Sequence, residues 1–156
     1  MPNKKFIYEH TVFFNETNAM GGVVYYSNYV KWQGITREDY FIKTVPEWQL
    51  IMQEVANGKV NMITVEEHSH FFKHAFFGDK ITIELHTEDI KQYCFNMVFV
   101  MRNIEKDDIL YKGWQKLTFD DFKGNFVPIP PPMLKSVLDH ATKEEHDRYK
   151  KRYMEK

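Results

Sequence analysis

Hydrophobic and polar positions follow different periods in the two halves of the chain. Phe6 to Phe14 alternates in part and is rich in β-branched and aromatic residues, which favours a strand. From Asn28 to about Thr44, apolar side chains recur at helical spacing. This pattern predicts a helix that is apolar around most of its circumference, with Ser27 as its cap. A second helical segment is predicted within 46–58, which begins with proline and ends with Asn-Gly.

The second half of the chain has a period of two, which predicts four strands. Their ranges are Lys59 to His70, Lys80 to Glu88, Gln92 to Arg102 and Ile109 to Phe119. Because the connections are short, these strands are expected to form an antiparallel meander. Gly113 lies inside the last strand, where a missing side chain would let a helix pack closely on the sheet. A charged helix is predicted from about Met133 to Tyr153.

The order of these elements predicts an α+β fold. A single antiparallel sheet of about five strands, wrapped around one long central helix, satisfies both hydrophobic patterns, and an additional C-terminal helix follows. The length of 156 residues suits one domain that spans 1–156.

Composition and charge narrow the class of protein. The chain is 43% hydrophobic and 16% aromatic, which is too rich for a disordered segment. A formal net charge of -1 argues against nucleic acid as a partner. The single cysteine, Cys94, cannot form an intrachain disulfide, and no run reaches membrane-spanning length. We therefore expect a soluble cytoplasmic protein without a membrane partner.

Three stretches carry a resemblance to a known family. They are ETNAMGGVVYYSNYVKW at 16–32, FFGDKITIEL at 76–85 and GNFVPIP at 124–130. Together they resemble the hotdog-fold thioesterases of the 4-hydroxybenzoyl-CoA thioesterase type, nearly end to end. More narrowly, WQG followed by Arg-Glu is similar to the enediyne-type thioesterases, which release polyene chains from an iterative polyketide synthase. The resemblance implies a hotdog fold and hydrolysis of a thioester.

The resemblance also directs attention to Asn18. Most of the family has a catalytic Asp in this loop, whereas the enediyne-type members lack that acid, as this chain does. The loop is one residue longer than the family spacing, so either Asn18 or Ala19 occupies the position of the acid. The amide of Asn18 can hydrogen-bond a thioester carbonyl or a water molecule. The alternative interpretation is an asparagine that only shapes the loop.

The start of the central helix is the candidate oxyanion site. Its free N–H groups and its dipole favour negative charge. Gly21 and Gly22 would allow close approach of the backbone to a ligand, or would merely make a tight turn. By analogy with the family loop, the N–H groups of Tyr25 and Tyr26 are expected to stabilise the oxyanion. Tyr29 is expected to contact the substrate or to belong to the core.

Arg37 and Glu38 follow further along the same helix. A buried arginine requires a partner, because an unpaired buried charge is costly. Arg37 could polarise the carbonyl or hold the β-keto oxygen of a polyketide, with Glu38 orienting it. The alternative is a structural ion pair at a subunit interface.

No metal or cofactor is expected. His68, His70 and His74 are close in sequence, but no cysteine or clustered carboxylate completes a ligand set. Cys94 lies in the middle of a predicted strand among apolar neighbours, which is typical of an inert thiol.

The sequence thus predicts a thioesterase that acts on a polyunsaturated β-keto polyketide chain on an acyl carrier protein. As the enediyne-type resemblance implies, decarboxylation of the product to a methyl ketone could follow. The expected partners are the carrier protein of a polyketide synthase or an acyl-CoA, and a second copy in a homodimer or homotetramer. Two alternatives remain: a general acyl-CoA or aromatic-acyl-CoA thioesterase, and a non-catalytic acyl-binding or carrier-docking protein.

Overall fold

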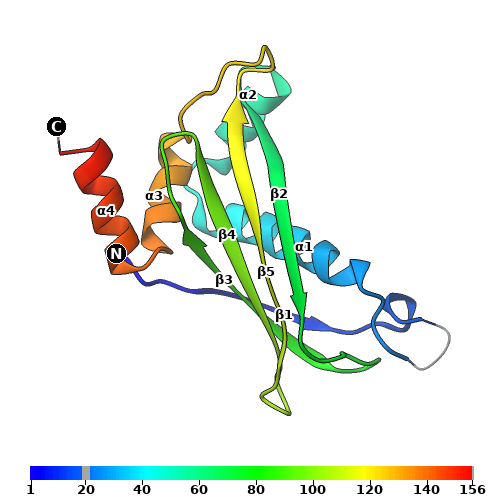
Figure 1. Cartoon of the computed structure of the whole chain (residues 1–156). Helices are drawn as coiled ribbons and strands as arrows, with labels where there is room; N and C mark the ends of the chain where they lie inside the picture. The colour runs from blue at the N-terminus through cyan, green and yellow to red at the C-terminus, as the bar shows by residue number, and fades with distance from the viewer. Residues whose placement is uncertain (19–21, 156) are drawn as a thin grey trace.

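A five-stranded sheet and a long helix dominate the structure, which is a computed structural model that describes residues 1–18 and 22–155. The strands are β1 (Phe6–Thr11), β2 (Asn61–Phe71), β3 (Lys80–Glu88), β4 (Cys94–Asn103) and β5 (Ile109–Asp120). The helices are the 3-10 helix η1 (Phe14–Glu16), α1 (Ser27–Thr44), α2 (Trp48–Ala56), α3 (Pro131–Asp139) and α4 (Lys143–Tyr153). The sheet order is β1-β3-β4-β5-β2, and every neighbouring pair is antiparallel. Figure 1 shows α1 lying across one face of the sheet, as the predicted hotdog fold requires.

The inner face of the sheet is apolar because apolar and polar side chains alternate along its strands. On β3, Ile81, Ile83 and Leu85 are fully buried, whereas Lys80 and Glu88 at its ends are exposed. The same alternation holds along β4. This alternation confirms the predicted period of two, and α1 packs on the apolar face of the sheet.

Helix α1 differs from its prediction in two respects. Its buried residues are Tyr29, Trp32, Gln33, Thr36, Tyr40 and Phe41. They form one stripe at helical spacing, whereas Lys31, Glu38 and Ile42 on the opposite side are exposed. The prediction of a helix that is apolar around most of its circumference was therefore wrong for the single chain. Ser27 is the first helical residue and not a cap, and Tyr26 at the cap position makes no side-chain capping bond.

Gly113 allows α1 to approach β5 closely, as predicted. A Cβ atom at this position would lie 2.5 Å from Gln33 Nε2 and 2.6 Å from the backbone oxygen of His68. No side chain fits in that space.

The C-terminal region forms two helices where one was predicted. The break lies at His140 and Ala141, where the chain pairs with the end of β3: the Thr87 N–H donates to His140 O at 3.1 Å. Thr142 then caps α4 by accepting the N–H of Glu145 at 3.2 Å. Within the residues that the structure describes, no helix is long and apolar enough to cross a membrane.

Candidate active site

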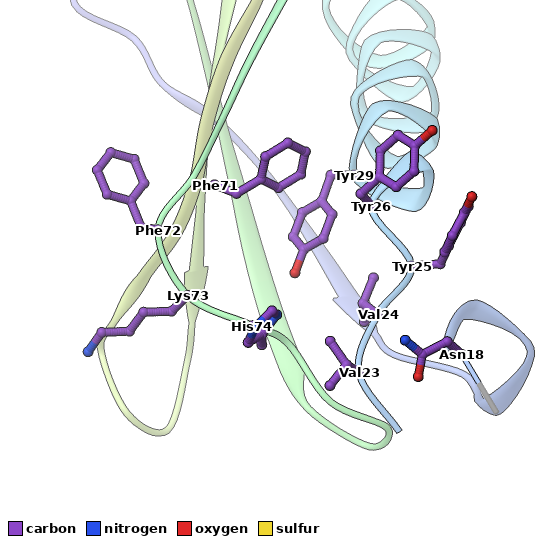
Figure 2. Close-up of a pocket in the computed structure, with 10 residues that line it drawn as sticks. All are labelled: Asn18, Val23, Val24, Tyr25, Tyr26, Tyr29, Phe71, Phe72, Lys73 and His74. Atoms are coloured by element: carbon purple, nitrogen blue, oxygen red, sulfur yellow. The ribbon is translucent and has the colours of Figure 1, made fainter. Parts of the chain in front are cut away.

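A cavity of about 440 Å³ opens at the N-terminal end of α1 (Figure 2). Its wall is formed by the loop that precedes α1, the first turn of α1 and the chain that leaves β2. The lining residues are Asn18, Val23, Val24, Tyr25, Tyr26, Tyr29, Phe71, Phe72, Lys73 and His74. Because five of them are Tyr or Phe, the cavity suits a flat or unsaturated apolar group.

A short antiparallel turn presents Asn18 to this cavity. The Asn18 N–H donates to Val23 O at 2.9 Å, and the Phe77 N–H donates to Gly22 O at 3.1 Å. Gly22 has a φ of +68°, which glycine adopts without steric cost. The loop is thereby anchored both to itself and to the connection between β2 and β3. The predicted positions Ala19 and Gly21 lie outside the described residues.

The two tyrosines at the helix start differ in their backbone bonding. The Tyr25 N–H donates to Glu16 O at 3.0 Å, so it is not free to bind a substrate. The Tyr26 N–H has no backbone acceptor within residues 1–18 and 22–155. The predicted pair of oxyanion donors is therefore corrected to one candidate, Tyr26, because the neighbouring amide closes the turn.

Tyr29 forms part of the cavity wall and part of the core. It is 3% exposed, and its ring stacks on Tyr111 with centroids 5.3 Å apart. Its hydroxyl accepts the N–H of Ala75 at 3.1 Å. Burial raises the pKa of the Tyr29 phenol, which therefore remains neutral near pH 7. Tyr29 therefore belongs to the core and also lines the cavity, and its contact with a substrate stays a prediction.

A buried carboxylate, Glu16, lies next to the site and received no role from the sequence. It is 5% exposed. Its side chain accepts hydrogen bonds from Trp32 Nε1 at 2.5 Å, His10 Nε2 at 2.8 Å and the Phe13 N–H at 2.8 Å. Burial opposes ionisation, but these hydrogen bonds outweigh it and lower the pKa of Glu16 below its ordinary 4.5. The only signal in the sequence was a charged residue in a Phe-rich segment, two positions before Asn18.

Arg37 and Glu38 lie apart from this cavity in the single chain. The Nη1 of Arg37 donates to Thr64 Oγ1 on β2 at 3.0 Å and to Gln115 Oε1 on β5 at 2.9 Å. Its Nε is buried without a hydrogen-bond partner among the described residues. Glu38 is more than half exposed, and its Oε1 lies 3.4 Å from Arg37 Nη2. The structure brings Asn18, Tyr25, Tyr26 and Tyr29 together, but it does not bring this ion pair to them.

The histidines do not gather into a metal site. Across the described part of the chain, no group of three or more His, Cys, Asp or Glu side chains could hold a metal ion. His74 lines the cavity, whereas His68 stacks on Trp114, with centroids 5.9 Å apart. Cys94, predicted to lie in the middle of a strand, is the first residue of β4 and is partly buried.

Solved structures with this fold include several thioesterases. A 1,4-dihydroxy-2-naphthoyl-CoA thioesterase from Synechocystis aligns with a TM-score of 0.79 at 18% identity, over 87% of this chain and 97% of that one. The dynemicin thioesterase, described with bound polyene, aligns with a TM-score of 0.80 at 22% identity, over 89% and 99%. A 4-hydroxybenzoyl-CoA thioesterase variant in complex with its substrate aligns with a TM-score of 0.71 at 21% identity, over 85% and 98%. At these identities the likeness shows the fold.

Comparison of the sequence with families is more decisive. A search of the curated proteins found no significant match. The family model described as the Thioesterase-like superfamily matches residues 12–137, which include the described residues of the cavity and the whole sheet except β1. The chain therefore belongs to the Thioesterase-like superfamily, a family of thioester hydrolases with the hotdog fold.

Proposed function

We propose that this enzyme hydrolyses a polyunsaturated β-keto polyketide chain carried as a thioester on an acyl carrier protein. The observation that supports this most directly is the aromatic cavity, which is lined by Asn18 and by Tyr26, whose N–H has no backbone acceptor among the described residues. Aromatic side chains pack well on a flat conjugated chain. The two polar groups can both bind an oxygen that becomes negative.

In the proposed reaction, water attacks the thioester carbonyl carbon. The carbonyl electrons move to oxygen, and the oxyanion accepts hydrogen bonds from the Tyr26 N–H and the Asn18 side-chain amide. The dipole of α1 adds favourable potential at the same point. His74 is the single histidine among the described residues of the cavity wall. We assign it the role of general base, which accepts a proton from the attacking water. Cleavage of the C–S bond then releases a thiolate, which takes that proton.

No covalent acyl-enzyme is needed in this scheme. The described cavity wall contains no carboxylate that could attack the carbonyl. The product is a β-keto acid, and its loss of carbon dioxide would leave a methyl ketone.

A second copy of the chain is part of the proposal, as a homodimer or a homotetramer. β2 pairs with β5 on one side and forms an edge of the sheet on the other. An open strand of 11 residues is a natural pairing surface. Arg37, which contacts Thr64 on β2, would then lie beside the subunit interface. Together with Glu38, it could bind the polar head of the polyketide substrate. Light scattering at micromolar concentration tests this assembly, and a monomer would contradict it.

An aromatic acyl-CoA is the second candidate substrate, because the same five rings would equally enclose an aromatic acyl group. Release of free thiol from a polyene β-ketoacyl carrier protein, compared with the matching acyl-CoA, separates the two. The proposal expects faster turnover of the carrier-bound chain, and faster turnover of short or aromatic acyl-CoA would overturn it. Binding without thiol release would instead indicate an acyl-binding protein.

A cytoplasmic location, suggested by the lone Cys94, belongs to the same proposal.

A further inference from the structure

Glu16 is buried beside the cavity without lining it. Its side chain is 7% exposed and accepts hydrogen bonds from three different parts of the chain. His10 is on β1, Phe13 precedes η1, and Trp32 is on the buried stripe of α1. One side chain thus connects the edge of the sheet to the central helix.

The backbone of the same residue fixes the turn that leads into α1. Glu16 O accepts the Tyr25 N–H at 3.0 Å and the side-chain amide of Asn28 at 2.8 Å. Because the Tyr25 N–H already donates to Glu16 O, the first backbone N–H at the helix start without a backbone acceptor among the described residues is that of Tyr26. Asn18 follows Glu16 by two residues, so both proposed oxyanion donors depend on where Glu16 is held.

A buried carboxylate is a costly way to hold a loop unless its geometry matters. Its desolvation is compensated here because three donors converge on its two oxygens. An amide in its place would direct an NH₂ group at one of these donors, and that unmatched contact would displace the segment. Packing alone could be achieved by an apolar residue.

We propose that Glu16 is a positioning residue, whose side chain holds residues 13–18 and 22–28 in place so that the Tyr26 N–H and Asn18 face the reacting carbonyl. This inference rests on the proposed thioesterase function. Glu16 acts through these two donors and does not touch the substrate.

The test compares Glu16→Gln with a matched control, Asp139→Asn. Asp139 is a carboxylate of similar burial, 13% exposed, which binds Lys135 Nζ at 3.4 Å at the end of α3. Both substitutions replace a carboxylate with an amide. For Glu16→Gln we expect kcat to fall about 10-fold to 100-fold while KM changes less than about 3-fold, since an oxyanion donor is misplaced. Asp139→Asn should leave kcat unchanged. Equal kcat in the two variants, at a similar loss of Tm, would overturn the proposal.

A second measurement does not depend on activity. Hydrogen exchange of the Tyr25 amide, followed by NMR, should be at least about 10-fold faster in Glu16→Gln than in the wild type or in Asp139→Asn. Unchanged protection of this amide would refute the clamp. If the wild type hydrolyses no thioester, the proposed function fails, whereas the exchange data still decide whether Glu16 holds the turn.

Trp32→Phe provides the test should Glu16→Gln fail to fold. It removes one donor to the carboxylate and retains most of the packing. The expected result is a several-fold fall in kcat with faster exchange at Tyr25. No change in either quantity would contradict the proposal.

Discussion

Gly113 of β5 lies directly beneath Gln33 of α1, so that a Cβ atom at 113 would come within 2.5 Å of Gln33 Nε2. The backbone oxygen of His68 is almost as close, at 2.6 Å, and cannot move without shifting β2. We predict that Gly113→Ala lowers the free energy of unfolding by about 1–3 kcal/mol, as overpacking does. Gly34→Ala is the control, because its Cβ would meet nothing within 4 Å and alanine favours a helix. Urea unfolding of both variants measures the difference, and equal stabilities would contradict the close approach.

Asn18→Ala should lower kcat by about 10-fold to 100-fold, because one of two proposed oxyanion donors is lost. KM should change little if the bond forms mainly in the transition state. Asn57→Ala, at the exposed end of α2, is the matched control. Full activity of Asn18→Ala in steady-state thiol release would assign Asn18 to loop shape alone.

His74→Gln should reduce kcat by at least about 10-fold, because the attacking water loses its proton acceptor. His70→Gln is the control, since His70 is exposed and does not line the cavity. If His74→Gln keeps the wild-type kcat in steady-state thiol release, another group takes the proton.

Arg37→Ala tests the role of the ion pair in turnover. We expect at least about 10-fold lower kcat/KM on a β-keto substrate and a smaller loss on a chain without the keto group, because the guanidinium is proposed to hold the keto oxygen. Arg148→Ala removes an arginine from the solvated face of α4 and serves as control. Equal losses on both substrates would assign Arg37 a structural role through Thr64 and Gln115.

The stability of the protein should fall as the pH drops below about 6.5, in part through His140. Burial lowers the pKa of His140 from its ordinary 6.5, although its bond to Ser136 O at 2.9 Å opposes the shift. The unfolded chain therefore binds a proton at this site at a higher pH than the folded chain does. The contribution of His140 to the free energy of unfolding is fully present above pH 6.5. It is lost as the pH falls toward the lower pKa that His140 has in the folded protein. Thermal unfolding from pH 5 to 8 should show a shallower slope in His140→Gln, and an unchanged slope would contradict the prediction.

Local patterns predicted most of the architecture. Lys80–Glu88 was predicted with the bounds that the structure has, because alternation along one strand suffices to identify it. The break between α3 and α4 was missed, since it depends on pairing with Thr87, more than fifty residues earlier in the chain. The exposed side of α1 was not predicted for a similar reason, because the aromatic residues of a helix do not by themselves show which of its sides packs on the sheet.

The candidate site, too, was predicted only where it depends on residues close along the chain. The loop and helix start were predicted from residues adjacent in sequence, and they meet in one cavity. The separation of Arg37 from that cavity was not predicted, because a helix of 18 residues extends well beyond one site. Glu16 was overlooked because its importance depends on donors from β1 and α1 that converge only after folding.

The sequence by itself determined the order and type of the main elements, the family resemblance and the loop that carries Asn18, because each depends on side chains close along the chain. Only the tertiary structure decided which amide at the helix start is free, where Arg37 binds and that Glu16 is buried. Hydrogen bonding and burial depend on partners distant in sequence, and packing of α1 on the sheet brings those partners together.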